Sequence, residues 1–138
     1  MPIPRGITIQ LNRKAIFVSI TKANRGDDPA IDANTTPEDR ARGYWHVNDG
    51  KAGQCELLVA VDDGIIVRVW EIDRDFGWRR WENANDIPTQ HHPDRDVDSQ
   101  RKYCQLLRVA PENAQLEGRQ ITDIEGMSRM RGPIDYNF

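Results

Sequence analysis

Residues 57–72 read Leu-Leu-Val-Ala-Val-Asp-Asp-Gly-Ile-Ile-Val-Arg-Val-Trp-Glu-Ile, two apolar runs on either side of Asp63-Gly64. Asp63-Gly64 predicts a two-residue hairpin turn, because glycine has no Cβ penalty at positive φ and aspartate tolerates it. The runs are therefore expected to be adjacent antiparallel strands. Nearly every position is apolar, so both faces should be covered, as in a closed barrel or a sheet covered by helices. Strict alternation would place Arg68 on one face with Ile66 and Trp70.

Other segments predict further strands and short helices. Runs of β-branched and aromatic residues predict strands at 15–20, 101–109 and 133–136, with further β material at Ile121 and Ile124. A cap residue, a proline and acids predict a helix from Thr36-Pro37 to about Gly43, and a second proline opens one over 111–116. Polar segments predict a loop or weak helical turn at 48–53 and exposed loops at 26–35 and 89–99. The predicted fold class is α+β, a small, strongly curved sheet with a few short helices.

Length and composition predict one globular domain over residues 1–138. Apolar residues make up 38% and charged residues 30%, a mixture that excludes collagen, coiled coil and disorder. No apolar run reaches the roughly 18 residues of a membrane span, and the start Met1-Pro2-Ile3-Pro4 has no export signal, so we expect a cytoplasmic location and no membrane partner. The net charge of −3 argues against a uniformly basic surface, and the oligomeric state is left open.

Motifs for enzyme chemistry are missing from the sequence. It contains no phosphate-binding glycine motif, no GxSxG and no HExxH, so no catalytic residue and no cofactor is predicted. Cys55 and Cys104 have no metal-ligand spacing and are expected to be reduced thiols. The acids and histidines of 91–98 are more typical of a solvated loop, and the aspartates around the hairpin are more typical of turns and strand ends, so no metal site is predicted.

Tryptophan and arginine are concentrated in one part of the chain. Aromatic faces stack on bases and guanidinium groups pair with phosphates or base edges, a combination suited to unpaired or flipped bases. Trp70 lies in a buried strand and is expected in the core. For the other tryptophans, core and pocket are weighed equally. The candidate ligand-binding residues are Arg42, Tyr44, Trp45, Trp78, Arg79 and Trp81.

Several segments resemble a known superfamily. Arg42-Gly43-Tyr44-Trp45, the hairpin with Asp63-Gly64-Ile65-Ile66, and the ending Gly132-Pro133-Ile134-Asp135-Tyr136 are similar to a group of bacterial proteins with "ATRGxW", "AVxxGxIxxVYxI" and "NPIRY" segments. Together they resemble the PUA-like barrels, which include EVE, ASCH and YTH domains. The resemblance covers residues 40–72 and the C-terminal segment. It implies a small, bent β-barrel with short helices that binds RNA or holds a modified base in an aromatic-lined pocket approached by residues 42–45.

The sequence is compatible with three functions. The leading hypothesis is a non-catalytic module that recognises RNA or DNA through a modified or unpaired base. The alternative is a small-molecule or protein-interaction module on the same barrel, and a metal-dependent nuclease or hydrolase ranks third. A nucleic-acid binder should gather its arginines on one face, whereas a metal enzyme should bring histidines and carboxylates into one cleft.

Overall fold

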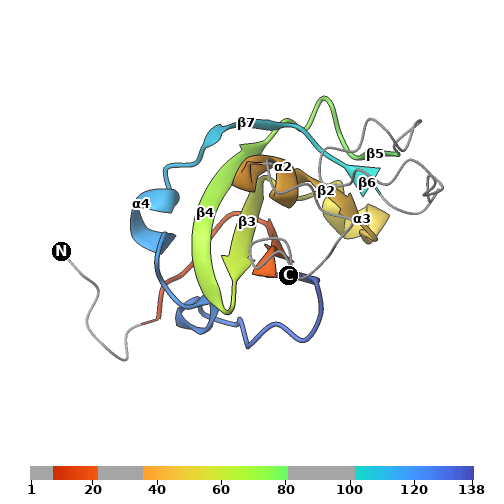
Figure 1. Ribbon diagram of the computed structural model, residues 1–138. Helices are drawn as coiled ribbons and strands as arrows, with labels where there is room; N and C mark the ends of the chain where they lie inside the picture. Colours follow the sequence, from red (N-terminus) through yellow and green to blue (C-terminus); the bar gives the residue numbers. More distant parts are fainter. Residues whose placement is uncertain (1–7, 22–35, 81–101) are drawn as a thin grey trace.

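A computed structural model describes residues 8–21, 36–80 and 102–138 (Figure 1). It is an α+β structure with a mixed five-stranded sheet in the order β7-β4-β3-β1-β8. β1 runs parallel to β3, and the other neighbours are antiparallel. The strands of this sheet are β1 (Ala15–Ser19), β3 (Leu57–Asp62), β4 (Ile65–Ile72), β7 (Leu106–Val109) and β8 (Ile134–Tyr136).

The hairpin between β3 and β4 forms as predicted. Asp63 and Gly64 have φ angles of 52° and 81°, so both central residues adopt the left-handed conformation that a tight hairpin turn requires. The expected alternation along β4 is wrong. Ala60 pairs with Arg68 but Val61 pairs with Ile66, so a bulge at residue 67 shifts the register. Ile66 and Trp70 consequently contribute to opposite faces of the sheet.

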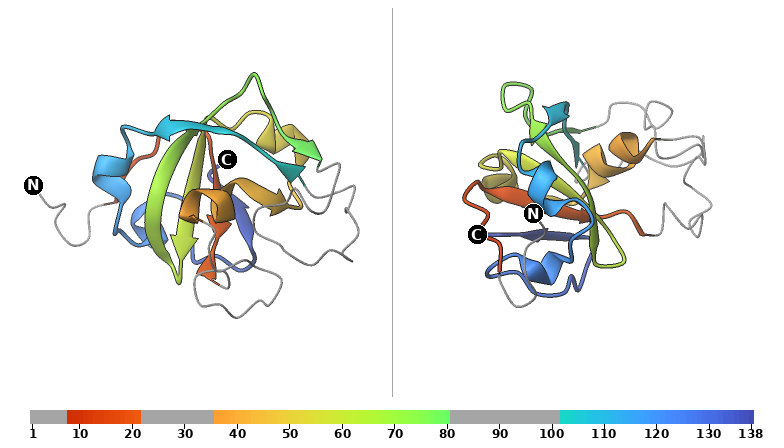
Figure 2. Two further views of the ribbon diagram at one scale, coloured as in Figure 1. Left: turned by 45° about the horizontal axis from the view of Figure 1, so that its top comes forward. Right: turned by 90° about the vertical axis from the view of Figure 1, so that its left-hand side faces the viewer.

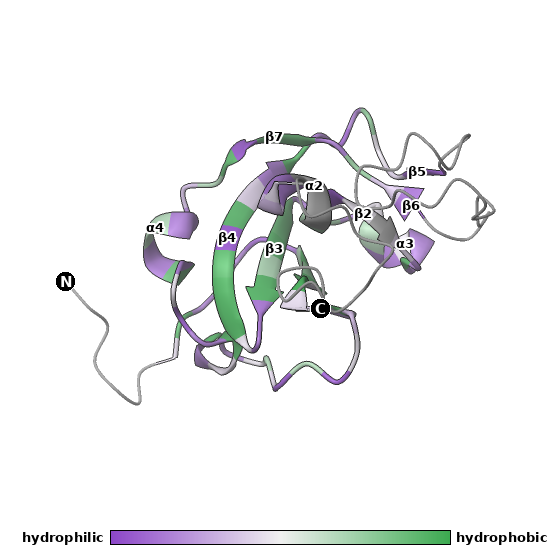
Figure 3. Ribbon diagram, viewed as in Figure 1, coloured by the Kyte–Doolittle hydropathy of each residue, from purple (hydrophilic) through white to green (hydrophobic). Residues whose placement is uncertain are grey.

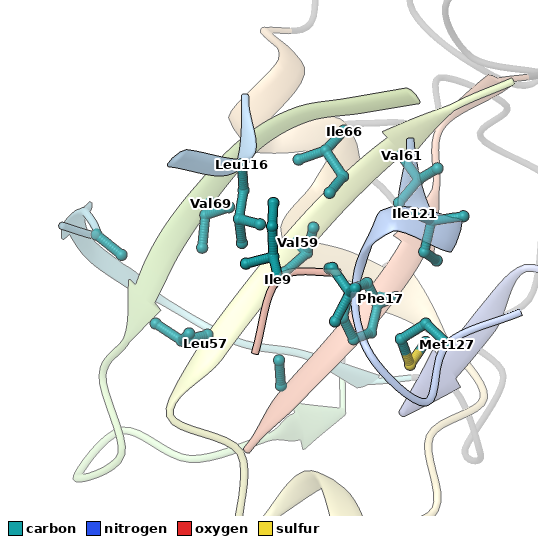
Figure 4. Packing of buried hydrophobic residues seen from close by; sticks show 13 residues of the cluster. Ile9, Phe17, Leu57, Val59, Val61, Ile66, Val69, Leu116, Ile121 and Met127 are labelled. Carbon is teal, nitrogen blue, oxygen red and sulfur yellow. The ribbon is translucent and has the colours of Figure 1, made fainter. Parts of the chain in front are cut away.

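Both faces of the central strands are covered, as the sequence predicted. Odd-numbered residues of β1 and β3 pack on one face against Ile9 and the segment 110–127, a cluster shown in Figure 4. Even-numbered residues pack on the other face with Ala41, Cys55, Cys104 and Trp70. Figure 3 shows the resulting apolar β3 and β4 between more polar connections. Val67 is half-buried, less than its apolar character predicted, because it is the residue at the bulge.

A second sheet has the order β2-β6-β5, with β2 at Gly43–Trp45, β5 at Arg79–Arg80 and β6 at Lys102–Tyr103. The single strand expected over 101–109 is therefore wrong, because β6 and β7 belong to different sheets. Between them the Cys104 amide turns to Arg42 and donates to its carbonyl at 2.9 Å, while the Gln105 carbonyl accepts from the Asp73 amide at 2.9 Å. Figure 2 shows β7 and β6 as successive parts of one bent ribbon. Within the described residues the two sheets do not close into a barrel.

Short helices lie near three of the predicted positions. α2 (Pro37–Arg42) begins at the predicted proline and ends before Gly43, and α4 (Asn113–Leu116) ends before Gly118, whose φ is 84°. α3 (Asp49–Ala52) begins after Asn48, whose side chain accepts a bond from the Lys51 amide. None of the described helices is long and apolar enough to cross a membrane. The loops expected at 26–35 and 89–99 lie outside the described residues.

The β material expected at Ile121 and Ile124 is wrong. Residues Ile121–Asp123 form the 3₁₀ helix η2, and Ile124 makes only an isolated bridge with Ile9. Both isoleucines are nevertheless buried in the core cluster of Figure 4. Their apolar character reflects packing against the sheet rather than extended pairing.

A network of charged side chains joins the N-terminal segment to the sheet. Arg13 donates to Glu71 at 2.9 Å and to Glu112 at 2.6 Å, and Arg108 donates to the second Glu71 oxygen at 2.6 Å. Hydrogen bonds from Arg108 and Arg13 lower the pKa of Glu71, and the bond from Arg13 lowers the pKa of Glu112. These carboxylates thus stay ionised and hold β4 and the residues before α4 to Arg13.

Candidate nucleic-acid interface

The small sheet brings together most of the candidate site segments. Arg42 is the last residue of α2, and Tyr44 and Trp45 lie in β2. Arg79 is the first residue of β5, and Trp78 directly precedes it. Trp81 lies outside the described residues, as does the Tyr44 side chain. Cross-strand pairing of Gly43 with Tyr103, and of Tyr103 with Arg79, places these segments side by side.

Trp45 and Trp78 both contribute to the core. Each is half-buried and packs against the cluster that contains Ile16 and Leu58. The Trp45 indole donates from Nε1 to the Ala41 carbonyl at 2.7 Å, which fixes the ring at the end of α2. The Trp78 Nε1 is buried and has no hydrogen-bond partner among the described residues. The sequence had left core and pocket equally weighted, and these contacts give both rings a structural role.

Phe76 and Tyr103, which are not among the candidate residues of the sequence, form a row of two rings with an arginine at each end. The Arg79 guanidinium lies 3.8 Å from the centroid of the Phe76 ring. The Phe76 and Tyr103 centroids are 5.6 Å apart with the rings tilted by 58°. The Arg42 guanidinium lies 5.9 Å from the Tyr103 centroid. We call Arg79, Phe76, Tyr103 and Arg42 the arginine–aromatic row.

A tight turn positions Phe76 in this row. The Asp73 carboxylate accepts from the amides of Asp75 and Phe76 at 3.1 and 3.2 Å. The Gly77 amide closes the turn on the Asp73 carbonyl at 3.2 Å, and Gly77 adopts a φ of 73°, which favours glycine. Asp73-Arg74-Asp75-Phe76-Gly77 is thus a turn signal in the sequence, and it could have marked Phe76 as a held aromatic residue.

The surroundings of the row are locally basic, although the whole chain carries a net charge of −3. Segments 42–45, 73–80 and 102–103 contain five cations, Arg42, Arg74, Arg79, Arg80 and Lys102, against two carboxylates, Asp73 and Asp75. Lys102 is paired with Asp49 at 2.7 Å. Arg74, Arg79 and Arg80 are exposed and form no ion pair with any carboxylate in the described part of the chain. Three cations are therefore available to an anionic ligand.

The residues considered for metal or nucleophilic chemistry are placed differently. No group of three or more histidine, cysteine or acidic residues in the described ranges could hold a metal ion, and 91–98 lies outside them. Cys55 and Cys104 are free, buried thiols. Burial raises the pKa of both, that of Cys55 to about 12. Both thiols therefore stay protonated and unreactive at neutral pH.

In comparisons with known proteins, no family model, no curated protein and no solved structure matches the chain. The resemblance to PUA-like barrels thus stays a prediction.

Proposed function

We propose that the protein is a non-catalytic nucleic-acid-binding module whose contact surface is the small sheet β2-β6-β5, on a bent, PUA-like β architecture. The arginine–aromatic row is the observation that supports it most directly. A guanidinium on a phenylalanine ring, next to a second ring and a second guanidinium, combines base-stacking planes with phosphate-binding donors. Arg74 and Arg80 are exposed and add positive charge to the segment 73–80 that contains Phe76 and Arg79.

The row favours single-stranded over duplex nucleic acid. Bases in a duplex are stacked on each other and shield their faces, whereas unpaired bases can stack on an aromatic ring or a guanidinium plane. A pocket for a modified or unpaired base, lined by Trp45 with Trp78 or Trp81, is the finer form of this proposal. The buried Trp78 Nε1, which has no acceptor among the described residues, would then be a donor to the ligand.

Salt dependence of binding tests the proposal. If Arg74, Arg79 and Arg80 each neutralise one phosphate of a single strand, the slope of log K against log salt is about −2, a roughly twentyfold loss between about 50 and 200 mM salt. Fluorescence anisotropy with short RNA and DNA strands measures this slope. Arg80→Ala should make it shallower by about 0.7, while Arg131→Ala, an exposed arginine before β8, should leave it unchanged. Failure of the wild type to bind any strand at about 50 mM salt contradicts the proposal.

A protein-interaction module is the second candidate, and the edge strand β7 favours it. Leu107 and Val109 are 56% and 47% exposed there. The Ala110 amide donates to Val69 on β4, so Val109 directs its own backbone groups away from β4. At the opposite edge the Tyr136 amide is satisfied by the Asp135 carboxylate. The partner that this edge fits is β7 of a second copy of the chain. If sedimentation equilibrium at high protein concentration shows only a monomer, this pairing of two β7 strands is excluded.

A further inference from the structure

The Arg79 side chain is held in one orientation although it is exposed. Its Nε donates to the Phe76 carbonyl at 3.0 Å, and its guanidinium lies 3.8 Å from the ring centroid of the same residue. The pairing of Arg79 with Tyr103 anchors its backbone. Phe76 is in turn fixed by the turn at Asp73 and by its contact with Tyr103. An arginine normally loses rotamer entropy when it binds a ligand, and here much of that entropy is already lost.

This orientation leaves the far end of the guanidinium unused. Of its five N–H donors, only that on Nε has a partner, and neither Nη1 nor Nη2 bonds to any described residue. The neighbouring Asp73 carboxylate accepts from two backbone amides in its turn. The remaining donors form a planar fork that presents two parallel N–H groups.

We propose that Arg79 is a ligand-binding residue whose planar guanidinium fork binds a pair of coplanar acceptor atoms. This inference rests on the proposed nucleic-acid function. In nucleic acid such a pair is supplied either by two phosphate oxygens or by O6 and N7 of guanine, the edge that arginine contacts most often. Lysine carries the same charge but has no planar fork, so Arg79→Lys separates the fork from the charge.

The test measures binding of two labelled single strands of equal length to the full chain at one salt concentration. One strand contains only thymine, and the other contains guanine. The proteins are the wild type, Arg79→Ala, Arg79→Lys and the control Arg131→Ala. The control removes one exposed charge from the segment before β8, a strand of the five-stranded sheet. Thermal unfolding of each variant shows whether it is folded. Phe76→Leu retains every cation but removes the ring under Arg79.

The expected result is that Arg79→Lys and Arg79→Ala both lose about tenfold to a hundredfold in affinity, while Arg131→Ala loses little. A loss confined to the guanine strand identifies the guanine edge, and an equal loss for both strands identifies phosphate. Phe76→Leu should weaken binding in the same pattern but by less, because it removes the ring under the Arg79 guanidinium and keeps the Nε bond to the residue 76 carbonyl. The inference is overturned if Arg79→Lys binds like the wild type, or if Arg79→Ala and Arg131→Ala lose equally, and the proposed function survives both results. No binding by the wild type removes the proposed function itself.

Discussion

Replacing Gly64 by alanine isolates the energy of one backbone conformation. Gly64 has a φ of 81°, and a Cβ built on it has no atom within 4 Å, so steric contact adds nothing. The left-handed conformation costs a residue with a Cβ about 1–2 kcal/mol. Alanine also reduces the conformational entropy of the unfolded chain, which offsets this loss of stability by about 0.4–1 kcal/mol. The net loss is about 1 kcal/mol, which for a domain of this length lowers Tm by about 3 °C.

Gly132 is the matched control. A Cβ there also has no atom within 4 Å, but its φ lies outside the left-handed region. Gly132→Ala should therefore leave stability unchanged or raise it by about 0.4–1 kcal/mol. Circular dichroism during thermal and urea unfolding measures both variants. Equal stability of Gly64→Ala and Gly132→Ala would refute the assignment of a strained left-handed turn at Gly64.

Three further predictions concern the core and its charged contacts. Leu58→Ala should lower the free energy of unfolding by about 2–5 kcal/mol in urea titrations, because Leu58 is fully buried; a loss below about 1 kcal/mol would argue against that packing. Because the pKa of Glu112 is lowered in the folded protein, its ionised carboxylate stabilises the fold at pH values above 4.5, the ordinary pKa of the group. This contribution to the free energy of unfolding is lost as the pH falls below 4.5. Glu112→Gln should thus flatten the fall of Tm between about pH 5 and 3, whereas the exposed Glu125→Gln should not. Cys55 and Cys104 should react with a thiol reagent at about pH 8 only after unfolding, and rapid labelling of the native protein would contradict their burial.

The sequence by itself determined the features whose physics is local. The hairpin follows from Asp63-Gly64 because a tight hairpin turn requires positive φ, which glycine adopts freely and aspartate tolerates. The start of α2 follows from Pro37, which has no amide hydrogen to lose and a φ suited to a helix. The unbroken apolar run of β3 likewise required two covered faces, which the two core clusters supply. The sequence also pointed to Arg42 and Arg79 as candidate site residues.

Only the tertiary structure decided which face, which partner and which neighbours each residue has. The bulge at residue 67 puts Ile66 and Trp70 on opposite faces, since a single extra residue reverses an alternation of period two. The apolar run 101–109 is divided because its two halves pair with different strands. Phe76 and Tyr103 are far apart in the chain and meet only because β5 pairs with β6. Contacts of this kind depend on strand pairing across the fold, which residue types and spacing do not encode locally.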